Sequence, residues 1–294
     1  MVWPFNFLIS QFKRYRRKDK MFKGMIDEVR KTAPLIHCIT NYVTVNDVAN
    51  MVLAVGGSPI MADDLEEVEE ITSLCKGLVL NIGTLNQRTT ASMLAAGKMA
   101  NKLGHIVVFD PVGVGASKLR TEIAKQLLRE IRLDVIRGNV SEIKTLALGS
   151  GDTQGVDVAK GDVVTEENLE GMISLARDLS QKTGAIIVIT GAIDLVVNEE
   201  KAYVIYNGHP LMAKVTGTGC MLTSVIATYV VAHKQNKIEA TAAALSTMGY
   251  CGEMAYEKLI QLQGGTSTYK MLLIDGMSQI TDEKLEEGKK VEIR

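Results

Sequence analysis

Short apolar runs alternate with longer amphipathic stretches along this chain from about residue 22 onward. The short runs are rich in β-branched residues, are closely followed by Gly, Asp or Asn, and cover residues 35–39, 77–82, 105–109 and 185–189. The longer stretches cover residues 45–55, 87–103, 122–131 and 166–182. Alternation of this kind is typical of successive βα units. We therefore expect an α/β fold with a mainly parallel central sheet and helices on both faces.

The later part of the chain departs from this alternation. Two short apolar runs, 194–197 and 202–206, flank the polar segment Asn198-Glu199-Glu200-Lys201, which predicts an antiparallel hairpin appended to the sheet. Two Ala-rich helical stretches follow at 221–233 and 238–262. Since no Pro- or Ser-rich linker interrupts the pattern, we expect residues 22–294 to form a single domain.

The N-terminal segment has a different composition. Residues 1–9 are apolar and aromatic, and the strongly basic segment 13–20 follows them. This order is the reverse of a secretory signal, and the apolar part is too short to span a bilayer. We expect residues 1–21 to be a disordered basic extension, with a peripheral tether to membrane or nucleic acid as the alternative.

Charge and cysteine content narrow the class of protein. Lys+Arg 33 against Asp+Glu 34 leaves a net charge of -1, so the chain as a whole gives no reason to expect nucleic acid or membrane partners. Its cysteines (Cys38, Cys75, Cys220 and Cys251) lie far apart, without metal-ligand spacing. Free thiols of this kind indicate a cytoplasmic protein without structural zinc.

The segment 215–220, Val-Thr-Gly-Thr-Gly-Cys, runs directly into an apolar helical stretch. Gly217 and Gly219 permit backbone conformations and close approaches that a Cβ would forbid. Free N–H groups and the positive end of the helix dipole would then face a bound anion. The alternative is a tight turn without a ligand.

Polar residues follow the predicted strands, at the edge where α/β proteins bind ligands. Asp110 precedes a Gly-rich loop and is suited to Mg²⁺ or its water shell, or else caps the next helix. Arg137 is suited to a nucleotide phosphate. Asn139 and Glu142 face the same way on a helix start, to hold hydrated Mg²⁺ or to form a capping box. Thr190 contacts phosphate or caps a turn.

Known nucleotide-binding motifs are missing from these loops. The glycine spacing does not match G-x-G-x-x-G after a strand, and the chain contains no G-x-x-x-x-G-K-[ST]. These absences count against a Rossmann dehydrogenase and against a P-loop NTPase.

The combined motifs resemble those of hydroxyethylthiazole kinases, thiamine-salvage members of the ribokinase-like superfamily. The resemblance covers roughly residues 22–280, and the segments that carry it are 39–44, 56–62, 110–116, 137–142, 207–210 and 215–220. It implies ATP-dependent phosphorylation of the hydroxyl of 4-methyl-5-(2-hydroxyethyl)thiazole, with Mg²⁺, by a homotrimer. The implied site residues are Arg137, Thr190, Thr218 and Gly219 for ATP, Met61, Gly217 and Asn41 for the thiazole, Asp110 and Glu142 for Mg²⁺, and Cys220 as the catalytic residue.

Cys220 distinguishes the narrower family from many sugar kinases of this fold, which carry Asp at that position. A thiol at a helix N-terminus could have a lowered pKa and accept the proton of the substrate hydroxyl as a thiolate. A neutral thiol could not do so well, but a loose phosphoryl-transfer transition state makes a strong base unnecessary.

Other functions remain open on the sequence alone. Hydroxymethylpyrimidine kinases and ATP/ADP-dependent hydrate dehydratases are similar at the glycine-rich loop but differ in their substrate motifs. A nucleotide-binding sensor without catalysis is the alternative from another class, and Asp110 and Glu142 speak against it.

Overall fold

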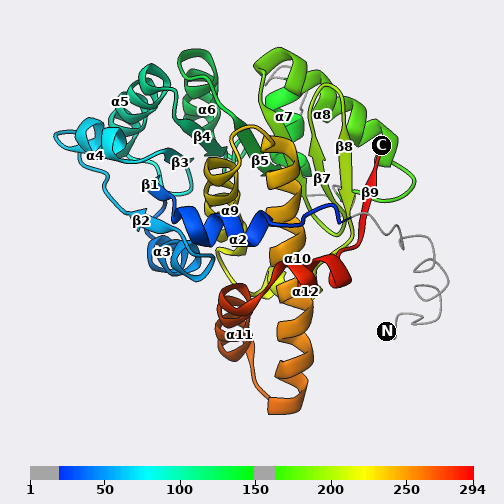
Figure 1. Ribbon diagram of the computed structural model, residues 1–294. Helices are drawn as coiled ribbons and strands as arrows, with labels where there is room; N and C mark the ends of the chain where they lie inside the picture. Colours follow the sequence, from blue (N-terminus) through cyan, green and yellow to red (C-terminus); the bar gives the residue numbers. More distant parts are fainter. Residues whose placement is uncertain (1–19, 149–162) are drawn as a thin grey trace.

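A nine-stranded sheet runs through the part of the chain that the computed structural model describes, residues 20–148 and 163–294. Its order is β2-β1-β3-β4-β5-β6-β7-β8-β9 (Figure 1). The strands are β1 (Leu35–Ile39), β2 (Ser58–Ile60), β3 (Gly77–Asn81), β4 (Ile106–Asp110), β5 (Val135–Asn139), β6 (Ile186–Thr190), β7 (Asp194–Val197), β8 (Ala202–Ile205) and β9 (Val291–Ile293).

The sheet confirms the predicted topology and extends it at both edges. Strands from β2 to β6 pair in parallel, and β7, β8 and β9 add antiparallel pairs. The predicted hairpin is β7 and β8. The edge strands β2 and β9 were not predicted, because three residues are too few to show an alternating pattern.

Helices cover both faces of the sheet, as expected (Figure 1). One face carries α2 (Met25–Thr32), α3 (Val45–Ala54), α9 (Thr218–Ala232) and α10 (Lys237–Leu262), with α11 (Thr266–Gln279) and α12 (Asp282–Gly288) packed on α10. The other carries α4 (Val68–Leu74), α5 (Gln87–Leu103), α6 (Lys118–Glu130), α7 (Val140–Leu148) and α8 (Leu169–Thr183). Strand residues alternate between the two cores: Leu78 and Leu80 face one, Val79 the other.

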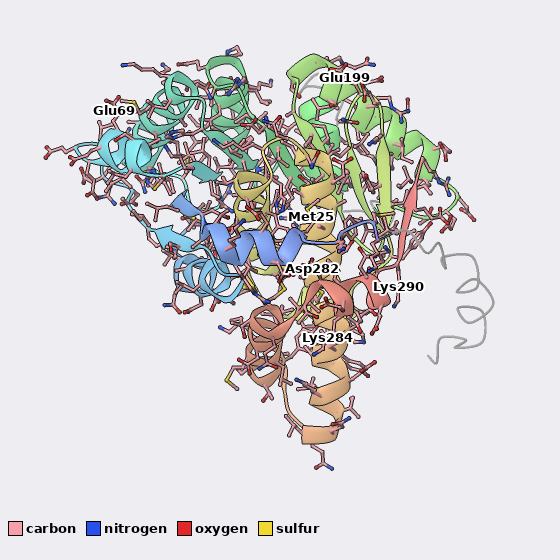
Figure 2. All side chains as sticks on the ribbon, viewed as in Figure 1. Met25, Glu69, Glu199, Asp282, Lys284 and Lys290 are labelled. Carbon is pink, nitrogen blue, oxygen red and sulfur yellow. The ribbon has the colours of Figure 1, made fainter. Side chains whose placement is uncertain are left out.

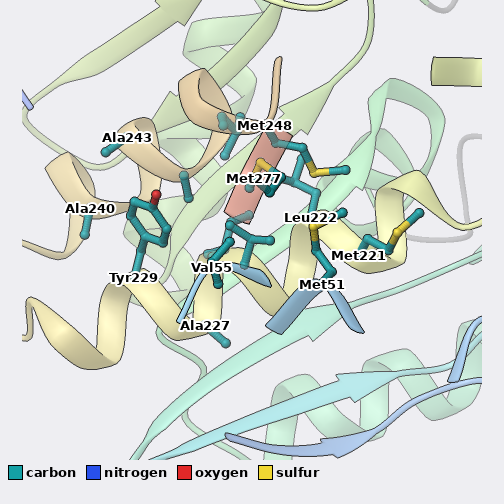
Figure 3. Close-up of a cluster of buried hydrophobic side chains, with 14 of the residues drawn as sticks. Met51, Val55, Met221, Leu222, Ala227, Tyr229, Ala240, Ala243, Met248 and Met277 are labelled. Carbon is teal, nitrogen blue, oxygen red and sulfur yellow. The ribbon is translucent and has the colours of Figure 1, made fainter. Parts of the chain in front are cut away.

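Helix α9 is enclosed on every side, and most of its side chains are apolar, with Thr223, Ser224 and Thr228 as buried exceptions. Every residue from Met221 to Val230 is buried, and α9 packs against β3, β4, α3 and α10. Figure 3 shows its side chains meeting Met51 of α3 and Met248 of α10. Full burial of a Val, Leu, Ile or Met side chain contributes about 1.5–3 kcal/mol to the stability of the fold. This packing holds the N-terminus of α9 rigidly at the carboxyl edge of the sheet.

The C-terminal segment ties distant parts of the chain together. Asp282 of α12 accepts hydrogen bonds from the backbone N–H groups of Ile26 (3.1 Å) and Asp27 (3.2 Å) of α2, which it meets in Figure 2. The N–H of Lys290 donates to Oδ1 of Asn207 (2.8 Å). The bonds of Asp282 hold α12 against α2, and the bond of Lys290 fixes Asn207 in the loop after β8, which leads into α9.

Two further observations bear on the sequence expectations. No helix in residues 20–148 and 163–294 combines the length and apolarity needed to cross a membrane. Nearly all of the expected basic extension, residues 1–21, lies outside the described residues, so its disorder and the domain boundary stay predictions.

Candidate active site

Polar side chains from neighbouring strands meet at the carboxyl edge of the sheet, below the N-terminus of α9. Asn81 at the end of β3 is in register with Asp110 at the end of β4, and Asn139 of β5 is in register with Thr190 of β6. Parallel strands present their carboxyl ends at one edge, so residues far apart in the sequence lie together.

The N-terminus of α9 has the conformation of an anion-binding site. Gly217 is its N-cap with φ 85°, in the left-handed region. The first helical bond runs from the N–H of Met221 to the carbonyl of Gly217 (2.9 Å), so the N–H groups of Thr218, Gly219 and Cys220 have no acceptor within the helix. The hydroxyl of Thr218 donates to the carbonyl of Met212 (3.2 Å), which leaves the backbone to face a ligand.

The loop after β1 presses closely against Gly217. A Cβ at Gly217 would lie 2.4 Å from Cγ2 of Thr44, the N-cap of α3. The left-handed φ and this contact both require glycine. The two loops are therefore packed against each other at the predicted thiazole site.

Arg137 lies across the N-terminus of α9. Its Nη2 donates to Oγ1 of Thr190 (2.5 Å), and its Nη1 lies 3.7 Å from Oδ2 of Asp110. A Cβ at Gly219 would stand 2.5 Å from Nη1, so the guanidinium occupies the space that this glycine leaves open. The Nε atom is buried without a partner. A cation beside the positive end of a helix is electrostatically unfavourable. A bound anion would therefore stabilise both the guanidinium of Arg137 and the N-terminus of α9.

Asp110 is a buried carboxyl with one bonded and one bare oxygen. Its Oδ2 accepts from Nδ2 of Asn81 (2.9 Å) and from Oγ1 of Thr223 (2.8 Å), whereas Oδ1 is buried without a partner. Burial raises the pKa of Asp110 to about 6; Arg137 opposes this shift, and the negative charge of Glu142 adds to it. A cation at Oδ1 would satisfy this oxygen.

Glu142 and Asn139 form the reciprocal capping bonds that the sequence offered as the alternative to a Mg²⁺ site. Its Oε2 accepts from the N–H of Asn139, and its own N–H donates to Oδ1 of Asn139, each at 2.8 Å. Its Oε1 accepts from the N–H of Gly113 (2.8 Å), which ties α7 to the loop after β4. Each carboxylate oxygen keeps a further lone pair that can accept from a metal-bound water.

The donor set fits a hydrated ion rather than a protein cage. Within the described parts of the chain, no group of three or more His, Cys, Asp or Glu residues could hold a metal by itself. Mg²⁺ in phosphate-transfer sites is held by one or two carboxylates, waters and substrate phosphates. Asp110, with its bare oxygen, and Glu142 fit that pattern.

Cys220 lies in the first turn of α9 but does not have the lowered pKa that this position suggests. Nδ2 of Asn41 donates to its Sγ at 3.3 Å. Burial raises the pKa of the thiol, the charge of Asp110 raises it further, and hydrogen bonds from Asn81, Asn41 and Thr44 oppose the shift. Desolvation is the largest of these causes and favours the neutral thiol over the thiolate. The direction of this shift is opposite to the lowered pKa suggested for a thiol at a helix N-terminus.

Asn41 and Met61 lie on the same side of the site, at the ends of β1 and β2. Asn41 is buried, and its Oδ1 accepts from the N–H of Thr44 (3.2 Å). Met61 is half-buried and packs against the core on the α9 face of the sheet. Nε2 of His37 bonds the carbonyl of Ala62 (2.8 Å), which fixes the backbone beside Met61.

Several residues of the site were missed from the sequence, among them Asn81, Asp194 and Arg120. Asn81 ends β3 and lies next to the end of the predicted run 77–82, so the strand-end rule could have identified it. Asp194 accepts from the N–H of Gly191 (2.8 Å) and so fixes the turn after Thr190, but it was read only as the start of a hairpin. Arg120 lies inside α6, where no pattern marks it, and donates to loop carbonyls of Ile82, Gly83 and Val112.

Known proteins are similar to this chain in sequence and in fold. A sequence model of the hydroxyethylthiazole kinase family matches residues 26–283. A hydroxyethylthiazole kinase of Clostridium acetobutylicum is 56% identical over 272 residues, which are 92% of this chain and 99% of that protein. The solved structure of a hydroxyethylthiazole kinase from Pyrococcus horikoshii superposes with a TM-score of 0.83 at 33% identity and covers 94% of this chain and 100% of its own.

A more distant structure supports the fold alone. A ribokinase-like superfamily protein of Enterococcus faecalis superposes with a TM-score of 0.58 at 12% identity, covering 87% of this chain and 90% of its own. The match to the family model and the sequence identity to family members support membership of the family, and not the fold alone. On these grounds, the chain belongs to the hydroxyethylthiazole kinase family.

Proposed function

We propose that this protein transfers the γ-phosphoryl group of ATP to the hydroxyl of 4-methyl-5-(2-hydroxyethyl)thiazole and releases the thiazole monophosphate. The observation that carries the proposal is the position of Arg137, whose guanidinium fills the space above Gly219 at the N-terminus of α9. Membership of the hydroxyethylthiazole kinase family supports the choice of acceptor.

Stabilisation of the transferred phosphoryl group falls to fixed donors. The N–H groups of Thr218, Gly219 and Cys220 and the guanidinium of Arg137 would bind its equatorial oxygens, where negative charge accumulates. These donors are held by α9 and β5, so little reorganisation is needed at the moment of transfer. Thr190 orients Arg137 through their 2.5 Å hydrogen bond.

Asp110 and Glu142 would hold hydrated Mg²⁺ beside the phosphates, where the ion neutralises charge when it is bound. The support is the bare Oδ1 of Asp110 and the unused lone pairs of Glu142. Asp110 also lies 3.7 Å from Arg137, so cation and guanidinium would share one polyphosphate chain.

Cys220 would orient the substrate hydroxyl rather than remove its proton. Burial raises the pKa of the thiol, and its sulfur already accepts a hydrogen bond from Asn41. In a loose transition state the hydroxyl becomes acidic only late, after bond breaking to the leaving group is advanced. Position, more than basicity, is what this thiol supplies.

The acceptor would bind between the loops after β1 and β2 and the start of α9. Met61 offers a polarisable thioether to the flat thiazole ring. Asn41 and Gly217 would shape the opposite wall, since the loops that carry them touch through Thr44.

We also propose a homotrimer with one kinase domain per chain, residues 22–294. Large apolar side chains are exposed beside the acceptor loops, among them Tyr42 (77% exposed), Leu53 and Met271. Such side chains are typical of subunit contacts. Sedimentation equilibrium would test the trimer, and a monomeric mass at micromolar concentration would contradict it.

We further propose a cytoplasmic location, which agrees with the four free cysteines.

The function is tested by incubating the full chain with MgATP and one alcohol at a time, followed by mass spectrometry. We expect monophosphate from the thiazole alcohol at a much higher kcat/KM than from hydroxymethylpyrimidine, and no dehydration of hydrated nicotinamide nucleotide. Folded protein that binds ATP but phosphorylates none of these alcohols would favour a sensor. Preference for the pyrimidine would assign the site to the other kinase.

A further inference from the structure

Two buried asparagine amides form a hydrogen-bonded chain at the ends of β1 and β3. The orientation of the first, Asn81, is fixed by the backbone. The N–H of Gly83 lies 2.9 Å from its Oδ1, and a backbone N–H can only donate, so that atom must be the oxygen. Nδ2 therefore faces Oδ2 of Asp110 at 2.9 Å, and Asn81 presents a donor to that carboxylate.

The second amide, Asn41, is fixed in the same way. Its Oδ1 accepts from the N–H of Thr44 at 3.2 Å and from the hydroxyl of Thr44 at 3.1 Å. Its Nδ2 therefore donates in the other direction, to Oδ1 of Asn81 (3.0 Å) and to Sγ of Cys220 (3.3 Å). Both amides are buried, so water does not compete for these bonds.

In this series of hydrogen bonds, each side-chain amide donates in the same direction, from the loop after β1 toward the phosphoryl-transfer residues. At one end, Asn81 and Thr223 together satisfy Oδ2 of Asp110, and Oδ1 is the oxygen left bare. At the other end, Asn41 donates to Cys220. The chain thus joins the carboxylate on the nucleotide side to the thiol on the acceptor side.

We propose that Asn81 is a positioning residue for phosphoryl transfer: it holds the Asp110 carboxylate with Oδ1 free and anchors Asn41 against Cys220. This role rests on the proposed kinase function and deepens it. The spacing between the nucleotide and acceptor halves is set by one amide whose two ends have different tasks. Its nitrogen end donates to Asp110 and also lies within hydrogen-bonding reach of the Cys220 thiol, and its oxygen end accepts from Asn41.

Two substitutions separate these two ends. Asn81→Asp keeps an oxygen acceptor for Gly83 and Asn41 but replaces the amide donor to Asp110 by a second buried carboxyl, which repels Asp110 or shares a proton with it. Asn81→Leu has a similar shape and removes both functions. A residue that merely fills the core would give losses of activity that follow losses of stability. A positioning residue gives a different kinetic pattern for each substitution.

The experiment uses the full chain, with kcat, KM for the thiazole alcohol, MgATP affinity by calorimetry, and the thermal midpoint. We expect Asn81→Asp to lower kcat and MgATP affinity each about 10- to 100-fold, as for loss of a hydrogen bond to a charged group. Its KM for the alcohol should stay within about threefold, because Asn41 keeps its acceptor. Asn81→Leu should in addition raise that KM about fivefold or more, since Asn41 loses its anchor.

Asn101→Asp is the matched control. Asn101 also joins two segments through both amide atoms, with Nδ2 donating to the carbonyl of Arg132 (2.9 Å) and Oδ1 accepting from its N–H (2.7 Å). It lies at the C-terminal end of α5, outside the site. Any loss of stability should leave kcat and both affinities within about twofold of the parent.

The outcomes distinguish this inference from the proposed function. If the parent chain makes no thiazole phosphate, the kinase function fails, yet Asn81→Asp must still weaken MgATP binding. A variant with the parent's kcat and MgATP affinity would overturn the positioning role. If neither variant folds, hydrogen exchange of the side-chain amides in the parent decides: strong protection of Asn81 and Asn41 supports the chain, and exchange as fast as at Asn101 overturns it.

Discussion

The proposed nucleotide half and the proposed acceptor half of this site are built differently. The nucleotide half consists of Asp110, Arg137 and Thr190 on adjacent central strands, and its contacts leave Oδ1 of Asp110 and Nε of Arg137 buried without partners. The acceptor half lies on the loops after β1 and the edge strand β2, where Tyr42 and Val43 are exposed. The charged groups are thus held in place on the central strands, whereas the surface for the acceptor is formed by loops at the edge of the sheet.

This contrast has a physical reason. Donors and carboxylates for phosphoryl transfer gain most when they are dehydrated and fixed, which the central strands and α9 provide. An apolar heteroaromatic ring needs surface that fits it, and loops supply such surface at lower cost. We therefore expect changes in the nucleotide half to affect turnover and changes in the acceptor half to affect KM.

The largest effect is expected at Arg137. Arg137→Ala should lower kcat/KM about 10³-fold, because an arginine on the transferred phosphoryl group contributes on that order. Arg137→Lys should recover little, since a lysine cannot reach Thr190 and the ligand with a planar fork. Steady-state kinetics measure the loss, with Arg129→Ala, an exposed site on α6, as the control. Parent-like turnover in Arg137→Ala would contradict the assignment.

Gly219→Ala comes next. The new Cβ would stand 2.5 Å from Nη1 of Arg137, so the guanidinium must move away from α9. We expect kcat to fall about 10²-fold, the cost of one misplaced stabilising group. Gly171→Ala is the matched control, because nothing lies within 4 Å of its Cβ on α8. It should leave kcat unchanged and stabilise the protein by about 0.5–1 kcal/mol.

Cys220 should have a smaller effect on turnover. Cys220→Ala should retain kcat within about tenfold, and Cys220→Asp should equal or exceed the parent, because a buried neutral thiol is a poor base. The raised pKa also predicts slower alkylation by iodoacetamide at pH 7 to 8 than for an exposed cysteine. Complete inactivity of both folded variants, or rapid alkylation at pH 7, would show that the thiolate does act.

The smallest effect is a pH dependence of stability set by Asp110. Its pKa rises from 3.8 to about 6 on folding, so between these values the folded state binds more protons and stability falls as pH rises. Asp110→Asn should therefore raise the thermal midpoint of the ligand-free protein at pH 7.5, and this gain should disappear below pH 4. Equal midpoints for the two proteins at pH 7.5 would contradict this sign.

Sequence patterns identified the central part of the molecule and missed its margins. The strands that became β1, β3, β4 and β6 are apolar runs buried on both faces, so their composition alone marks them. The short strands β2 and β9 lack such a signal. The Ala-rich stretches predicted α9 and α10 closely because both are buried over most of their length.

The site shows the same division. Strand-end positions pointed to Asp110, Arg137 and Thr190, since topology alone brings them together. For Cys220 the sequence suggested a lowered pKa from the helix terminus alone, whereas burial by residues distant in sequence raises the pKa. Arg120 could not be found, because its acceptors are carbonyls of loops that approach only in the folded state.

One measurement tests the central claim most directly: phosphorylation of the thiazole alcohol by the parent chain and by Gly219→Ala under identical conditions, with ATP consumption and thiazole monophosphate quantified together. We expect one monophosphate for each ATP consumed in the parent, and about 10² times slower formation in the folded variant. Equal rates in the two proteins, or ATP consumption without thiazole monophosphate, would contradict the assignment of the α9 N-terminus as the phosphoryl-transfer site.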